Sequence, residues 1–225
     1  MNDRGRRGAL RWMAAAAVIG TVLGVTGCQQ TATRTKAAAQ ATTDGGAAIT
    51  NMAGGGRTGG ACVFIKPDGA QKFGHVGWGF KVAGTNQWVY GAVENPTNKL
   101  YTPPGGDIGA WHAQGTYDRM LSEMSRDAHY PGKSTHPYSR YRCTDSSRYD
   151  VNAAWAMIRK VEARGFLVGV DPRTGELTSR DCLDATYDVL KAYRTKGLTK
   201  ADKLSIPNLW VELLWGWSDQ KLTPR

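Results

Sequence analysis

The sequence predicts an α+β domain, in which an antiparallel sheet packs against helices, preceded by a disordered N-terminal tether. β-Branched and aromatic runs dominate the start of the domain, and helical spacing of apolar residues dominates its C-terminal part. The residues before the domain are rich in Ala, Thr and Gly. We therefore divide the chain into residues 1–27, 28–60 and 61–225.

Residues 1–27 have the pattern of an export signal. A basic start that includes Arg6 and Arg7 precedes an apolar run at 12–25. As a helix this run rises about 21 Å, which is too short for a hydrocarbon core of about 30 Å. The Val-Thr-Gly that precedes Cys28 resembles the bacterial lipobox, in which the cysteine is lipidated. The alternative is an ordinary secretory signal, and the arginine pair also resembles a twin-arginine motif, so the export route stays open.

Residues 28–60 have too little apolar bulk to fold by themselves. We interpret them as a flexible linker, whose typical reach is about 30 Å from its length and composition. If Cys28 is acylated, a lipid bilayer is the partner of the chain. The domain would then lie on the extracytoplasmic face of the cell membrane, close to its anchor.

The first elements of the domain are predicted to be strands. Residues 62–65 form a short apolar run with β-branched members. Residues 75–82 and 88–93 form two more runs, which a polar, Gly-containing segment at 83–87 joins. This pattern predicts a β-hairpin.

A helix, a strand and a turn are predicted to follow one another after residue 150. Asp150 can cap a helix whose apolar residues keep helical spacing over 151–161, and Gly165 can end it. Residues 166–170 then predict a strand. The Asp-Pro-Arg-Thr-Gly at 171–175 predicts a turn.

Two further helices are predicted toward the C-terminus. Asp181 can cap a helix in which residues 183, 187 and 190 share one face and residues 182, 186, 189 and 193 share another. A third helix is predicted to start near Pro207 and to include Trp217. Its tryptophans at 210, 215 and 217 are expected in the core. Residues 95–147 predict an irregular insertion with one helix at about 116–128, because Pro and Gly cluster there.

The charge of the chain does not indicate a nucleic-acid partner. The net charge is +10, but residues 61–225 carry only +5, from 22 basic and 17 acidic side chains with no run of five like charges. The sequence has no phosphate-binding Gly loop, no HExxH and no paired CxxC. We therefore expect no metal and no other cofactor.

Cys182 is the candidate for a catalytic nucleophile. A cysteine in the first turn of a helix lies at the positive end of the helix dipole, which favours the nucleophilic thiolate, although Asp181 and Asp184 oppose this effect. A catalytic thiol also needs a base. Of the four histidines, only His75 begins a predicted strand, in the setting Gly-His-Val-Gly. The opposing interpretation is that Cys182 is a buried core residue, as most cysteines are.

The residues around His75 and Cys182 resemble a known family. Gly-His-Val-Gly-Trp at 74–78, with the Trp-Val-Tyr that follows the turn, resembles the His-bearing hairpin of NlpC-type papain-like cell-wall hydrolases. Asp-Cys-Leu-Asp-Ala-Thr at 181–186 resembles their Cys-bearing helix start. The order His before Cys is that of the circularly permuted branch, which includes lecithin:retinol acyltransferase-like enzymes. The resemblance covers residues 75–95 and 178–193, and it implies a papain-like fold.

The resemblance also implies the roles of the site residues. Cys182 would be the nucleophile and His75 the general base, and a third polar residue on the strand after His75 would orient the imidazole. Tyr90, Gln87 and Glu94 are the candidates. We favour Glu94, because a carboxylate is the best of the three partners for an imidazolium.

The cysteine count leaves the state of Cys182 open. In an exported protein cysteines tend to oxidise, and three remain once Cys28 is lipidated. A disulfide between Cys62 and Cys143 would leave Cys182 free, as catalysis requires. A disulfide that includes Cys182 would exclude catalysis by its thiol, and the sequence does not choose among the three pairings.

Two functions are therefore compatible with the sequence. The first is thiol-dependent amide or ester hydrolysis or acyl transfer on cell-envelope material, such as peptidoglycan peptides. The second is a non-catalytic surface lipoprotein that binds envelope polymer or a partner protein through an aromatic groove, since the domain contains seven tryptophans.

Overall fold

The computed structural model describes residues 59–130, 132 and 136–224. The predicted export signal, Cys28 and the linker up to residue 58 lie outside the described residues. No helix within the described ranges is both long enough and apolar enough to cross a bilayer.

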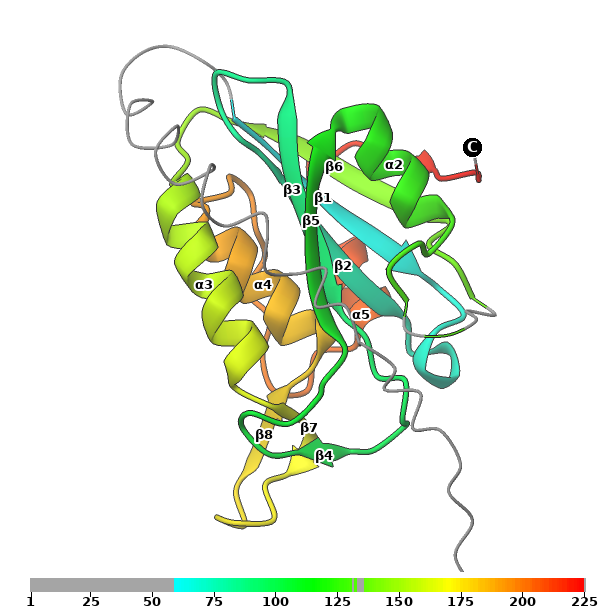
Figure 1. Ribbon diagram of the computed structural model, residues 1–225, viewed down its shortest axis with the longest axis vertical. Helices are drawn as coiled ribbons and strands as arrows, with labels where there is room; N and C mark the ends of the chain where they lie inside the picture. Colours follow the sequence, from blue (N-terminus) through cyan, green and yellow to red (C-terminus); the bar gives the residue numbers. More distant parts are fainter. Residues whose placement is uncertain (1–58, 131, 133–135, 225) are drawn as a thin grey trace, which may run out of the picture. The chain divides into compact units, whose positions relative to one another are not determined.

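Six strands form the main sheet, and each hydrogen-bonded pair in it is antiparallel (Figure 1). Their order across the sheet is β5-β3-β2-β1-β6-β9. The strands are β1 (Gly59–Lys66), β2 (His75–Lys81), β3 (Gln87–Val93), β5 (Ala110–Thr116), β6 (Arg140–Ser146) and β9 (Gln220–Lys221). The predicted hairpin is confirmed as β2 and β3, and the predicted run at 62–65 lies within β1.

A smaller antiparallel sheet has the order β4-β7-β8. Its strands are β4 (Tyr101–Thr102), β7 (Phe166–Val170) and β8 (Leu177–Arg180). The predicted strand at 166–170 is confirmed as β7, and the turn at 171–175 joins it to β8, where Gly175 takes a positive φ of 73°. β8 leads directly into the helix that carries Cys182, so this sheet fixes the approach of the chain to that residue.

Helices cover both faces of the main sheet (Figure 1). These helices are α2 (Tyr117–Ser125), α3 (Val151–Ala163), α4 (Cys182–Ala192) and α5 (Pro207–Glu212). A short 3-10 helix, η1 (Ala70–Lys72), has no buried residue. One apolar cluster joins α3, α4 and α5 to alternate residues of β1 and β2, and a second joins α2 to the opposite face. Because both faces are covered, every residue of β1 is buried and the strand reads as an almost continuous apolar run.

The predicted helix caps are confirmed. The Asp150 carboxylate accepts a hydrogen bond from the Ala153 N–H at the start of α3. Asp181 caps α4 and forms a reciprocal capping box with Asp184. The caps explain why both helices begin where the sequence predicts them.

Residues 95–147 are more regular than their sequence predicts. They supply β5 and β6 to the main sheet, and their helix α2 ends at Ser125 rather than near residue 128. Both strands carry polar side chains and are only partly buried, so the alternation of apolar and polar residues that predicts a strand is weak in them.

The C-terminal helix is shorter than predicted. α5 ends at Glu212, so Trp217 lies outside it. Trp210 and Trp217 are buried, and their indole N–H groups donate to the backbone carbonyls of Thr199 and Gly197. The expectation that Trp215 belongs to the core was wrong, since this side chain is 79% exposed.

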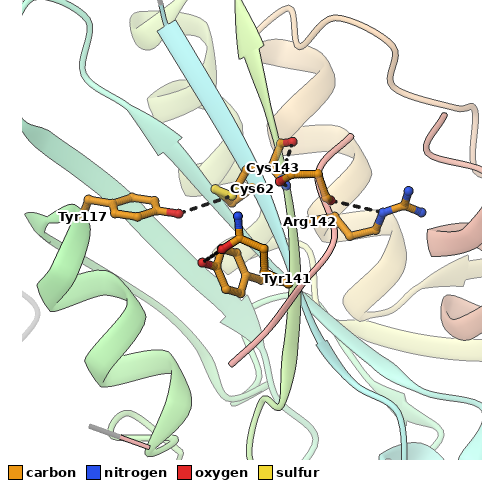
Figure 2. Close-up of a disulfide and its surroundings, with 7 residues drawn as sticks. Cys62, Tyr117, Tyr141, Arg142 and Cys143 are labelled. Atoms are coloured by element: carbon orange, nitrogen blue, oxygen red, sulfur yellow. Dashed lines mark hydrogen bonds between the residues drawn. A yellow bond between two sulfur atoms is a disulfide. The ribbon is translucent and has the colours of Figure 1, made fainter. Parts of the chain in front are cut away.

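The structure selects one of the three possible cysteine pairings. Cys62 and Cys143 face each other across β1 and β6 and form a disulfide, shown in Figure 2 beside Tyr117 and Tyr141. Cys182 is the free cysteine among the described residues. The thiol that catalysis would need is therefore available.

Candidate active site

His75 is the first residue of β2, and the residue before it fixes the direction of the chain. Gly74 has a φ of +92°, and a Cβ at this position would lie 2.2 Å from the side-chain oxygen of Asn208. Both constraints require glycine here. The His75 side chain is nearly buried, with 9% of the residue exposed.

Cys182 is the first residue of α4 and is 7% exposed. The Asp181 carboxylate accepts hydrogen bonds from the Leu183 and Asp184 N–H groups, so two of the first three helix donors are occupied. In the described part of the chain no acceptor contacts the backbone N–H of Cys182 itself. This N–H remains available beside the sulfur, at the positive end of the helix dipole.

The structure brings His75 and Cys182 into electrostatic contact, although 107 positions separate them in the sequence. Burial by itself would lower the pKa of His75. The Glu94 carboxylate and then the Cys182 sulfur act against burial, and together they raise this pKa from 6.5 to about 10. The imidazole is therefore charged at neutral pH.

Glu94 supplies the carboxylate that pairs with the imidazole. It directly follows β3, and its Oε2 lies 3.0 Å from Nε2 of His75, which is an ion-pair distance without good hydrogen-bond alignment. Glu94 is only 2% exposed, and burial by itself would raise its pKa. The interaction with His75 and the smaller interaction with Lys66 outweigh burial, and together they lower the pKa of Glu94 to about 2.

The other two candidates for the third residue have different partners. The Tyr90 hydroxyl donates to Glu123 at 2.5 Å, on the α2 side of the sheet. The Gln87 side-chain amide donates to Asn86 at 3.0 Å. Neither side chain has a described contact with His75, so the geometry favours Glu94 among the three.

Three residues at this site were missed by the sequence analysis: Lys66, Asp127 and Tyr138. Lys66 places its Nζ 3.2 Å from Oε2 of Glu94 and 2.7 Å from Oδ2 of Asp127. The Tyr138 hydroxyl donates to Oε1 of Glu94 at 3.0 Å. A lysine that ends an otherwise apolar strand is a signal that could have identified Lys66.

Two of the remaining described histidines have carboxylate partners of their own. His112 Nδ1 lies 2.6 Å from Glu162, and His129 Nε2 lies 2.7 Å from Glu123. Neither residue is among the main causes of the raised pKa of His75. The described ranges contain no group of three His, Cys, Asp or Glu side chains arranged to hold a metal ion.

Comparison with known proteins assigns no family. No family model, no curated protein and no solved structure matches the chain.

The arrangement can perform thiol chemistry. A free thiol lies at a helix N-terminus, beside an imidazolium that a buried carboxylate holds. An imidazolium next to a thiol favours the thiolate, which is the nucleophile, and it can also give its proton to a leaving group. The unoccupied Cys182 N–H can donate a hydrogen bond to a developing oxyanion.

Proposed function

We propose that the protein is a thiol-dependent hydrolase or acyltransferase with a papain-like fold, acting on amide or ester bonds of cell-envelope material such as peptidoglycan peptides. One observation carries the proposal: the only free thiol of the described domain interacts with an imidazole whose other partner is a buried carboxylate. Burial of the ionisable side chains of Lys66, His75, Glu94 and Asp127 costs free energy, and groups perturbed in this way cluster at functional sites.

In the proposed mechanism, the Cys182 thiolate attacks a carbonyl carbon and forms an S–C bond. The resulting oxyanion accepts a hydrogen bond from the Cys182 backbone N–H. The C–N or C–O bond then breaks, and the leaving group takes the proton of the His75 imidazolium. A thioester and a neutral imidazole remain.

The second half of the cycle decides between the two activities. Neutral His75 takes a proton from water or from an acceptor amine or hydroxyl, and that group attacks the thioester carbonyl. Breaking the S–C bond releases the acyl product and restores the thiolate and the imidazolium. Water gives hydrolysis and another acceptor gives acyl transfer, so both activities need the same three side chains.

The chain geometry supports the papain-like part of the proposal. Cys182 begins a helix that packs on the main antiparallel sheet, and His75 begins a strand of that sheet. This is the juxtaposition implied by the resemblance to the permuted NlpC-type enzymes. In the same proposal Glu94 orients the imidazole.

We also propose that the domain lies outside the cytoplasmic membrane, held there by a lipid on Cys28. The Cys62–Cys143 disulfide supports an oxidising compartment. The basic and apolar pattern of residues 1–27 supports export. Metabolic labelling with a palmitate analogue, compared between the natural chain and Cys28→Ser, tests the anchor: loss of label in the variant supports it, and equal labelling refutes it.

Thiol labelling tests the enzymatic proposal without knowledge of the substrate. We expect iodoacetamide to alkylate Cys182 at pH 6, where an ordinary thiol with a pKa near 8.5 is almost wholly protonated. Peptide mapping assigns the label to Cys182 rather than Cys28, and His75→Gln should abolish the reaction at this pH. A Cys182 that reacts only as an ordinary thiol does would support the non-catalytic binding protein instead.

A further inference from the structure

We infer that Lys66 is a positioning residue for the proposed reaction: its ammonium group keeps Glu94 ionised and in place at the stage when His75 has given up its proton. The inference rests on the proposed function. Lys66 does not contact Cys182 in the described structure, so it acts through Glu94.

The backbone places Lys66 beside His75. The two residues are partners in the antiparallel register of β1 and β2. Their charged groups meet at one carboxylate oxygen, because Oε2 of Glu94 lies 3.2 Å from Lys66 Nζ and 3.0 Å from His75 Nε2. Glu94 is thus held between two cations that neighbouring strands supply.

The second carboxylate oxygen is also occupied. Oε1 of Glu94 accepts a hydrogen bond from Lys66 at 3.3 Å and from the Tyr138 hydroxyl at 3.0 Å. Burial, with Glu94 as the next cause, raises the pKa of Tyr138 well above 10, so this hydroxyl keeps its proton and remains a donor. The carboxylate therefore has little freedom to rotate.

The side chain of Lys66 is buried and surrounded by partners. Only 4% of the residue is exposed, and its Nζ lies 2.7 Å from Asp127 as well as close to Glu94. The rings of Tyr130 and Tyr138 lie 4.8 Å and 4.4 Å from Nζ, within the range of cation–π attraction. These partners surround the ammonium group with two carboxylates and two aromatic rings, which offset the cost of burying it.

The charges at the site explain why a second cation is useful. In the resting state of the proposed mechanism, Lys66 and His75 carry positive charge and Glu94 and Asp127 carry negative charge, so these four side chains balance, and the Cys182 thiolate adds one negative charge. When His75 gives its proton to a leaving group, a carboxylate that depended on His75 alone would become a buried, unpaired charge. Such a group takes up a proton, and it would then no longer hold the imidazole for the second half of the cycle. Lys66 prevents this because it takes no part in the proton transfer and still pairs with Glu94 at that stage.

A titration of Glu94 in two variants tests the inference directly. The His75→Gln background reproduces the stage at which the imidazole carries no charge. The Glu94 carboxylate is followed by ¹³C NMR against pH, with Glu94→Gln to assign its signal. The groups that interact with this carboxylate are the side chains of Lys66, His75, Tyr138 and Tyr130. Asp127 pairs with Lys66, and Cys182 interacts with His75.

We expect the Glu94 midpoint to stay below its ordinary pKa of 4.5 in His75→Gln. Adding Lys66→Met should raise the midpoint by about one to three pH units, because an adjacent opposite charge lowers a carboxyl pKa by that amount. Adding Lys66→Met together with Asp127→Asn keeps the charge balance and should raise it as well. An unchanged midpoint in folded protein would overturn the inference.

A second readout uses the reaction of Cys182. The acid edge of its alkylation should move to higher pH in Lys66→Met and return toward the natural position in Lys66→Arg, while the exposed Lys72→Met leaves it in place. A merely structural role would lower the yield of folded protein without moving the edge. The titration of Glu94 does not depend on Cys182, so an unreactive Cys182 with a shifted Glu94 midpoint would refute the proposed function and leave the electrostatic role of Lys66 intact.

Discussion

Glu94→Gln is the substitution that most directly tests the candidate site. The amide has nearly the same shape as the carboxylate but carries no charge, so it removes the first of the causes that raise the pKa of His75. Burial, which lowers this pKa, is unchanged. The Cys182 sulfur remains as the weaker raising cause.

The size of the effect follows from the contacts. Glu94 Oε2 lies 3.0 Å from His75 Nε2, and an opposite charge within about 4–6 Å moves a pKa by about 1–3. The distance is below this range, so the upper end applies. Lys66 then also faces His75 without the carboxylate that separates the two cations. We expect the His75 midpoint to fall from about 10 by about three pH units, to near neutrality or below.

The assay is an NMR titration of the histidine rings in ¹⁵N-labelled protein, with His75→Gln to assign the signal. Glu162→Gln is the matched control, because Glu162 also pairs with a histidine, His112, at 2.6 Å. It should leave the His75 midpoint unchanged.

Two results would refute the reasoning. One is a His75 midpoint near 6.5 in the natural protein, which would mean that the carboxylate and the sulfur do not outweigh burial. The other is a midpoint near 10 in Glu94→Gln, which would mean that a different group holds the imidazolium.

The ion pair of His75 and Glu94 also predicts how the free energy of unfolding depends on pH. The folded pKa of His75 lies above its ordinary value, so its contribution is complete below 6.5 and is lost as pH rises toward about 10. The folded pKa of Glu94 lies below its ordinary value, so its contribution is complete above 4.5 and is lost as pH falls toward about 2. The natural protein should therefore exceed Glu94→Gln in free energy of unfolding most clearly between pH 4.5 and 6.5, and denaturant titration measures this difference.

Further substitutions test separate parts of the structure. Cys182→Ser should abolish low-pH alkylation of the domain while leaving the free energy of unfolding within about 1 kcal/mol of the natural value, because the two side chains are similar in size. Replacing Cys62 and Cys143 by Ala should lower the free energy of unfolding by about 4 kcal/mol, since the disulfide closes a loop with a sequence separation of 81; a loss below about 1 kcal/mol would contradict this. Burial and the neighbouring Asp184 raise the pKa of Asp181 to about 6, so ionising it disfavours the folded state. Relative to Asp181→Asn, the natural protein should lose stability as pH rises from about 4 to 6, and circular dichroism during denaturation at each pH checks the direction.

Much of the fold was determined by local sequence. The hairpin of β2 and β3, the strand at 166–170 and the starts of α3 and α4 follow from alternation, helical spacing and capping residues. These signals involve residues within a few positions of one another, so a single chain displays them. The weakly patterned strands β5 and β6 were not predicted, because their pairing with β3 and β1 compensates for poor local signals.

For the candidate site too, the sequence predicted some features and the tertiary structure decided the others. The sequence by itself identified Cys182 at a helix start, His75 at a strand start and Glu94 among three candidates. Only the tertiary structure decided that the Cys62–Cys143 disulfide leaves Cys182 free and that Glu94 lies at the imidazole. It alone placed Lys66 there, through the register of β1 with β2. The physical reason is that ion pairs and disulfides depend on distances across strands, whereas capping and periodicity depend on neighbours along the chain.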